Sequence, residues 1–214
     1  MAWMGKALAA AWLAAACSCV LAAPTSEPGS TPLQPATRLS PEASELIERV
    51  TRTGDHDKLP FAVVDKKDAR IYVFDAAGRL RGASTALLGQ ATGDDSAPDV
   101  GAHAQTGDVP LAERTTPAGR FVSEPGRNLT GEHVIWVDYD SAFAIHRVRP
   151  GRSRQARLAR LESPNPEDRR VSLGCVVVPA HFYAQVVRRW LGQGRAVVYV
   201  MPESAAVAVS GSPM

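Results

Sequence analysis

One cysteine of this chain lies where its chemistry could be used. Cys175 closes the stretch Ser172-Leu173-Gly174-Cys175 and is followed by three valines and Pro179. Glycine adopts backbone angles closed to other residues and a β-branched run favours a strand, so the sequence predicts a tight turn at the mouth of a strand. Backbone N–H groups of such a turn can bind an oxyanion. The structural alternative is a small buried residue, because free cysteines are often buried.

Two motifs upstream of the cysteine favour the chemical interpretation. His146 lies in the strand-like run 143–147, and residues 116–121 read Thr-Pro-Ala-Gly-Arg-Phe, a turn that leads into a strand. Strand alternation places His146 with Ala144, away from Phe143 and Ile145, so the histidine need not be a core residue. A cysteine and a histidine supply the nucleophile and the base of acyl transfer. An imidazole within reach is expected to lower the pKa of the thiol from about 8.5.

The order of these motifs, Thr-Pro-x-Gly-x-Phe, Ile-His and Ser-x-Gly-Cys, resembles the catalytic domain of the L,D-transpeptidases (YkuD-type), which cross-link bacterial peptidoglycan. The resemblance covers residues 59–202. It implies a mainly β fold, an L,D-transpeptidase-type β-sandwich with a few peripheral short helices. By matching position, Cys175 is the acyl-accepting nucleophile and His146 its base. Backbone N–H groups around Gly174 and Cys175 would polarise the carbonyl, and Ser172 would hold the loop or His146 in place.

The chain departs from the family pattern two residues after the cysteine, where Val177 replaces an arginine implicated in binding substrate. Some relatives with Gly-Cys-hydrophobic-Asn-Val-Pro followed by aromatics resemble this chain more closely. Arginine suits carboxylates through its planar fork of donors, so a replacement is expected nearby. Arg169 or Arg170 is the first choice, because Arg147 follows His146 on a strand and should face the opposite side. Solvation of all three arginines is the alternative.

The resemblance implies the reaction as well as the site. The donor would be the stem tetrapeptide of peptidoglycan, with D-alanine leaving, and the acyl group would pass to another stem (3–3 cross-linking), to a lipoprotein, or to water. No cofactor and no metal are expected, since His103 has no second ligand at metal spacing. A catalytically weakened peptidoglycan-binding protein on the same fold is the alternative. A cysteine peptidase of unrelated fold lacks its local signature here.

The N-terminal residues indicate export. Lys6 precedes an apolar, small-residue run, so residues 1–23 are expected to be a signal peptide that directs the protein to the periplasm or cell envelope. The alternative is lipidation of Cys17, which would tether the protein to the membrane. Either route leaves Cys175 as the one cysteine of the folded domain. Residues 24–40 form a Pro/Ser-rich linker, 41–203 the catalytic domain, and 204–214 a tail expected to be disordered.

The charged residues are concentrated before the cysteine motif. The segment 147–170 contains eight arginines (147, 149, 152, 154, 157, 160, 169 and 170), although the net charge of the whole chain is only +2. That net charge and the expected export argue against a nucleic-acid partner. A carboxylate-bearing wall substrate and a plainly solvated surface both remain open.

Periodicity predicts the elements that must position these residues. A helix is expected over 40–53 because Ser40 can cap it and Pro41 suits its first turn. A long acidic loop covers 90–114. Further helices are expected at 153–162 and 180–191, and strands at 61–65, 71–75, 80–88, 119–123, 133–138, 142–146, 176–178 and 196–201.

Overall fold

The computed structural model of the protein describes residues 39–203. The expected signal peptide, nearly all of the expected linker and the expected tail lie outside the described residues. Within the described range, no helix is long and apolar enough to cross a membrane.

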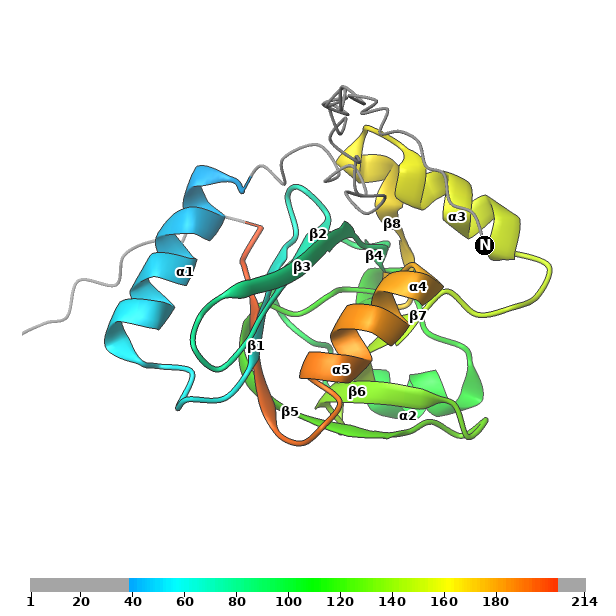
Figure 1. Cartoon of the computed structure of the whole chain (residues 1–214). Coiled ribbons are helices and arrows are strands. Elements are labelled where there is room, and N and C mark those ends of the chain that lie inside the picture. Colours follow the sequence, from blue (N-terminus) through cyan, green and yellow to red (C-terminus); the bar gives the residue numbers. More distant parts are fainter. Residues whose placement is uncertain (1–38, 204–214) are drawn as a thin grey trace, which may run out of the picture. The chain divides into compact units, whose positions relative to one another are not determined.

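Ten strands define the fold. They are β1 (Phe61–Asp65), β2 (Arg70–Phe74), β3 (Leu80–Thr85), β4 (Leu88–Gly89), β5 (Gly119–Arg127), β6 (His133–Asp138), β7 (Phe143–Arg147), β8 (Arg170–Ser172), β9 (Val176–Val178) and β10 (Ala196–Val200). Eight of them form one sheet in the order β3-β2-β1-β10-β5-β6-β7-β9 (Figure 1), and β4 and β8 form a separate pair. The fold is therefore mainly β, as the sequence predicts.

Strand β5 joins the two halves of the large sheet. Its residues 119–123 pair with β10, and its residues 124–127 pair with β6. The pairs β1·β10 and β7·β9 are parallel, whereas the other neighbours in this sheet are antiparallel. The parallel pair β7·β9 matters for function, because it sets His146 opposite Val177, two residues after Cys175.

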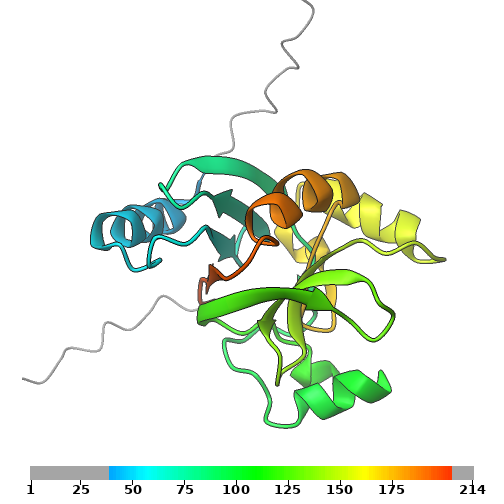
Figure 2. The same cartoon turned by 60° about the horizontal axis from the view of Figure 1, so that its bottom comes forward.

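The helices are short and lie around the sheet. They are α1 (Pro41–Thr53), α2 (Val100–Thr106), α3 (Arg154–Glu162), α4 (Ala180–Phe182) and α5 (Arg188–Trp190), and a π-helical turn, Tyr183–Val187, joins the last two. Helix α1 begins as predicted, since Ser40 Oγ accepts a hydrogen bond from the backbone N–H of Ala43 at 3.1 Å. Figure 2 shows α2 and the α4–α5 segment on opposite sides of β5 and β6.

The core has two main apolar clusters because the central strands are covered on both faces. In β1, the side chains of Phe61 and Val63 pack toward α1. The side chains of Ala62 and Val64 belong to the other cluster, on the opposite face of the sheet. Alternate residues of a strand face opposite sides, so five consecutive buried residues indicate a fully covered strand. This packing fixes the strands from which the site is built.

The structure corrects the sequence prediction in three places. The expected loop 90–114 contains α2 and a 3₁₀ turn, Leu111–Glu113, the expected strand 80–88 is broken into β3 and β4, and β5 runs on to Arg127. Helix α2 has little apolar periodicity and no side-chain cap, so its own sequence hardly signals it. Tertiary contact places it, because a Cβ at Gly101 would lie only 1.9 Å from the carbonyl oxygen of Asp140.

Candidate active site

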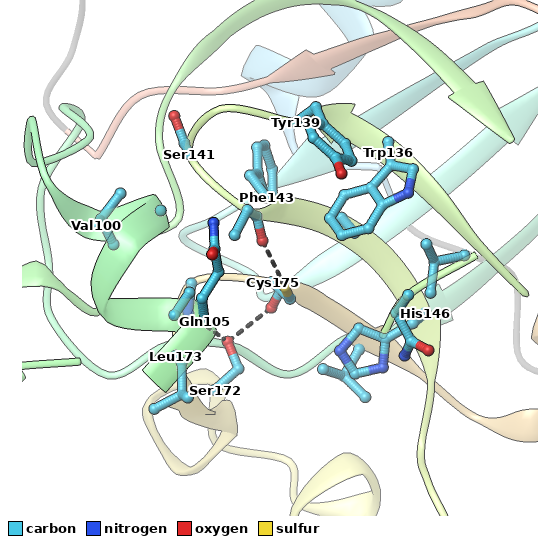
Figure 3. A pocket seen from close by; sticks show the side chains of 18 of the residues that line it. Val100, Gln105, Trp136, Tyr139, Ser141, Phe143, His146, Ser172, Leu173 and Cys175 are labelled. Carbon is cyan, nitrogen blue, oxygen red and sulfur yellow. Dashed lines mark hydrogen bonds between the residues drawn. The ribbon is translucent and has the colours of Figure 1, made fainter. Parts of the chain in front are cut away.

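A pocket of about 560 Å³ opens beside Cys175. Its walls come from α2, β6, β7, α3 and the turn before β9. All four residues predicted to form the catalytic group line it, namely His146, Ser172, Gly174 and Cys175. Figure 3 shows Cys175 amid the side chains of Phe143, Ser172 and His146. Residues from two separate motifs thus meet at one cavity, and their catalytic role stays a prediction.

The turn that presents Cys175 requires glycine. Gly174 has a φ of 128°, and a Cβ there would lie 2.8 Å from the carbonyl oxygen of Thr115. Ser172 closes the turn, since its Oγ donates to the carbonyl oxygen of Cys175 at 2.6 Å and accepts from the N–H of Gly174 at 3.1 Å. Ser172 therefore holds the loop; it makes no hydrogen bond to His146 within the described structure.

Thr116, from the Thr-Pro-x-Gly motif, braces the same turn. Its Oγ1 donates to the carbonyl oxygen of Gly174 at 2.8 Å and accepts from the N–H of Gly89 at 2.9 Å. The first motif is therefore structural here, because it joins the turn before β9 to strand β4. A buried hydroxyl that both donates and accepts fixes both of its partners.

Lys66 lies behind Thr116, and no feature of the sequence marks its role. Its ammonium group is fully buried and donates to the carbonyl oxygens of Gly93 (2.6 Å) and Thr116 (3.0 Å) and to Asp94 Oδ1 (2.7 Å). Glu203 Oε1 lies 3.7 Å from the same nitrogen. The pair Lys66-Lys67 looks like an ordinary polar turn, yet Lys66 anchors the segment that holds the cysteine turn.

His146 is set up as a neutral base. Its Nδ1 lies 2.9 Å from the carbonyl oxygen of Arg147. A carbonyl oxygen only accepts, so Nδ1 carries the proton and Nε2 is left as the acceptor. Burial lowers the pKa of His146 to about 4, and the charges of Arg149 and Arg157 act in the same direction, although the bond to Arg147 opposes them. The imidazole is therefore neutral at physiological pH.

Cys175 is a neutral thiol in this arrangement, which corrects one expectation. Burial raises the pKa of the Cys175 thiol above its usual value, while a backbone hydrogen bond from Ala144 and the charge of Arg149 act against it. Its Sγ donates to the carbonyl oxygen of Ala142 at 3.5 Å. No hydrogen bond joins it to His146 in the part of the chain that the structure describes. A neutral imidazole cannot stabilise a thiolate by its charge. The pKa of the Cys175 thiol therefore lies above its usual value, not below it as predicted from the sequence.

The three arginines expected to bind substrate are engaged elsewhere. Arg169 donates to the carbonyl oxygens of Ser163 and Asp68. Arg170 donates to the carbonyl oxygen of Lys66 and pairs with Glu203 at 2.9 Å, and Arg147 pairs with Glu132 at 2.8 Å. They are not among the residues that line the pocket, although Arg149 and Arg157 are. Closeness to the motif in sequence therefore does not place a guanidinium in this pocket.

Val177 occupies an apolar position. It is 1% exposed and packs with Leu87, Val148 and Leu161, against which Leu158, Val171 and Cys175 also pack. Leu158 and Leu161 belong to α3, so this helix lies over the position at which the family pattern has an arginine. Val177 also lines the pocket, so an arginine at 177 would give up these apolar contacts with α3 at the pocket wall.

Comparison with known proteins finds similar solved structures but no similar sequence. No family model matches the sequence, and no curated protein matches it. The structure is similar to solved L,D-transpeptidase structures. One is a cysteine-to-serine mutant of Enterococcus faecium L,D-transpeptidase (16% identity, TM-score 0.36, 66% of this chain and 49% of that one). Another is an L,D-transpeptidase from Mycobacterium smegmatis (16%, TM-score 0.38, 66% and 58%).

A third similar structure is the helical cell shape determining protein Pgp2 from Campylobacter jejuni (15% identity, TM-score 0.41, 69% of this chain and 49% of that one). The match spans about half the length of the first solved chains. These likenesses concern the chain fold and not the chemistry of the site.

Proposed function

We propose that this protein is an L,D-transpeptidase-like cysteine acyltransferase that acts on peptidoglycan stem peptides in the cell envelope. The observation that carries the proposal is the shared pocket of Cys175 and His146, in which Nδ1 of the histidine is fixed by Arg147 and Nε2 remains to accept a proton. Neither residue is charged at rest, so the pair is suited to general-base catalysis. The sequence motifs support the same assignment.

In the first half-reaction, Sγ of Cys175 attacks the carbonyl carbon of the bond between residues three and four of a stem tetrapeptide. The thiol proton passes to Nε2 of His146. The tetrahedral intermediate collapses by breaking the C–N bond, and His146 returns the proton to the leaving amine of D-alanine. The product is a thioester on Cys175, with the histidine neutral again.

In the second half-reaction, an amine of another stem peptide or of a lipoprotein, or a water molecule, attacks the thioester. His146 removes the proton from the attacking group and returns it to the departing sulfur. The products are a 3–3 cross-link, an attached lipoprotein or a shortened stem peptide. Each outcome regenerates the neutral thiol.

One backbone donor is better placed than the other for the oxyanion. The N–H of Gly174 already donates to Ser172 Oγ, which leaves the N–H of Cys175 as the donor for the developing charge. One well-placed donor contributes roughly 3–4 kcal/mol to the transition state of acyl transfer. The hydrogen bonds from Ser172 and Thr116 would hold this donor in place during the reaction.

The proposal is tested by incubating the protein with a stem tetrapeptide and measuring released D-alanine by mass spectrometry. We expect release by the wild type, none by Cys175→Ala, and at least a hundredfold loss by His146→Ala, the size of a general-base contribution. A protein that releases no D-alanine, or a Cys175→Ala variant that releases as much as the wild type, would contradict the proposal.

The second candidate function is a peptidoglycan-binding protein that no longer turns over. It is favoured by the raised pKa of Cys175 and by the absence, within residues 39–203, of a hydrogen bond between its thiol and His146. Such a protein would bind the tetrapeptide with the same affinity in the wild type and in Cys175→Ala, and would release no D-alanine. The assay above separates the two functions.

A further inference from the structure

The side chains that line the pocket give it a positive charge. Among residues 39–203, three arginines line it, Arg127, Arg149 and Arg157, and no aspartate, glutamate or lysine does. An arrangement of this kind attracts an anion, because cations along a cavity with low-dielectric walls concentrate their field in it.

The three arginines differ in how far they are already neutralised. Arg127 donates to the carbonyl oxygen of Gly131 at 2.6 Å, at the mouth of the β5–β6 hairpin. Arg149 pairs with Glu132 at 2.9 Å, and Glu132 is shared with Arg147. The guanidinium of Arg157 makes no hydrogen bond or ion pair to any residue of the described range. The guanidinium of Arg157 is therefore the one whose charge and hydrogen-bond donors are available to a ligand.

The packing of α3 explains why Arg157 reaches the pocket. Leu161, one turn after Arg157 on the same helix face, is buried in the cluster that contains Val177. A small apolar residue at 177 allows the helix to lie there, and the helix then carries a guanidinium to the pocket wall. The same substitution thus removes one arginine from the motif and makes room for another.

We propose that Arg157, assisted by Arg149, binds the carboxylate of the residue that leaves during acyl transfer, and so makes the protein selective for stem peptides whose fourth residue ends in a free carboxylate. This inference rests on the proposed function and names the group that the same site recognises. Arginine holds a carboxylate through two parallel hydrogen bonds, which gives direction as well as strength.

The leaving residue is the natural partner because of His146. His146 must return its proton to the amine of that residue, so the carboxylate attached to the same residue comes to lie on the histidine side of the pocket. Arg149 and Arg157 both act electrostatically on His146, whereas only Arg149 acts on Cys175. Both guanidiniums are therefore within electrostatic reach of the base.

Binding there would also strengthen the base. The charges of Arg149 and Arg157 lower the pKa of His146, so a carboxylate that neutralises them raises it. The acidic and basic groups that face His146 from its surroundings are Arg147, Arg149, Arg157 and, through its ion pairs, Glu132. A donor with a free carboxylate would thus improve the histidine that activates its own attack.

The test compares two donors that differ at one group. One tetrapeptide ends in D-alanine and the other in D-alaninamide, and kcat/KM for release of the terminal residue is measured with the wild type, Arg157→Gln and Arg149→Gln. Arg154→Gln is the matched control, because Arg154 begins the same helix but is exposed and does not line the pocket. A charge-assisted bond is worth roughly tenfold or more, so the wild type should prefer the acid by that factor.

Loss of the preference is the decisive result. Arg157→Gln should bring the acid-to-amide ratio to within about threefold, Arg149→Gln should reduce it less, and Arg154→Gln should keep it. An equal ratio in wild type and Arg157→Gln would overturn the inference while leaving the proposed function intact. If no residue is released from either donor, the proposed function fails, and the dissociation constants of the two peptides for the same variants decide the inference by the same ratios.

Discussion

Two charged regions of the protein use the same kinds of side chain for opposite purposes. Behind the cysteine turn, Lys66 and Arg170 are buried and matched by Asp94 and Glu203. At the pocket, Arg149 and Arg157 face the cavity, and one nearby carboxylate, Glu132, is already divided between two arginines. The first region joins segments that are distant in sequence, and the second keeps charge available.

The difference shows that a cation's role follows from its unused hydrogen-bond donors. A buried ammonium with three acceptors has no hydrogen-bond donor free for a ligand, so its role is to hold distant segments of the chain together. A half-exposed guanidinium without a partner keeps its fork of donors free.

The largest effect is expected for Lys66→Met. Loss of the ammonium leaves two carbonyl oxygens and the carboxylate of Asp94 without this partner, so the free energy of unfolding should fall by about 3–5 kcal/mol. Urea denaturation measures it. Lys67→Met is the control, because Lys67 is exposed and should change stability by less than about 0.5 kcal/mol. Equal effects of the two substitutions would show that the buried cluster around Lys66 does not hold these segments together.

A smaller loss is expected for Val177→Arg. Its guanidinium would enter the apolar cluster under α3, at a cost of about 2–3 kcal/mol, moderated because the long side chain can snorkel toward solvent. Thermal unfolding measures this loss, and Leu173→Arg, at a position that is 44% exposed, should be nearly neutral in the same experiment. Restoring the family arginine should not raise turnover. A stable Val177→Arg protein with faster turnover would mean that α3 does not replace that residue.

The smallest effect is a shift in the pH dependence of thiol alkylation. Because burial raises the pKa of Cys175, its rate with iodoacetamide should reach half-maximum above pH 8.5, the value of an ordinary cysteine. Arg149→Gln should move it further upward, since the charge of Arg149 favours the thiolate. Fast alkylation below pH 7 would reveal a preformed thiolate–imidazolium pair and would contradict the neutral pair described here.

The sequence predicted those parts of the site that depend on residues close to one another in the chain. The glycine before Cys175, the valine run after it and the strand that ends near His146 identify a turn and two strands without reference to the rest of the chain. The parallel pairing of β7 and β9 then brings the two residues to one pocket. The mainly β fold followed from the same periodicity.

The rest depended on tertiary packing. Arg149 and Arg157 were two of eight arginines in one basic segment, and only the seating of α3 on Val177 separates Arg157 from its neighbours. Lys66 resembled Lys67, although one is buried and the other exposed. Helix α2 is held by close contact at Gly101 rather than by its own propensity. The pKa of Cys175 depends on burial, which the tetrapeptide motif does not encode.

The most direct test of the central claim is the mass of the intact protein after incubation with a carbapenem, whose β-lactam ring acylates a nucleophile activated for this chemistry. We predict one adduct per wild-type molecule, carried by the tryptic peptide that contains Cys175, slower formation in His146→Ala, and no adduct in Cys175→Ala. An adduct that persists in Cys175→Ala, or a wild-type protein that stays unmodified, would contradict the assignment of Cys175 as the acyl-accepting nucleophile.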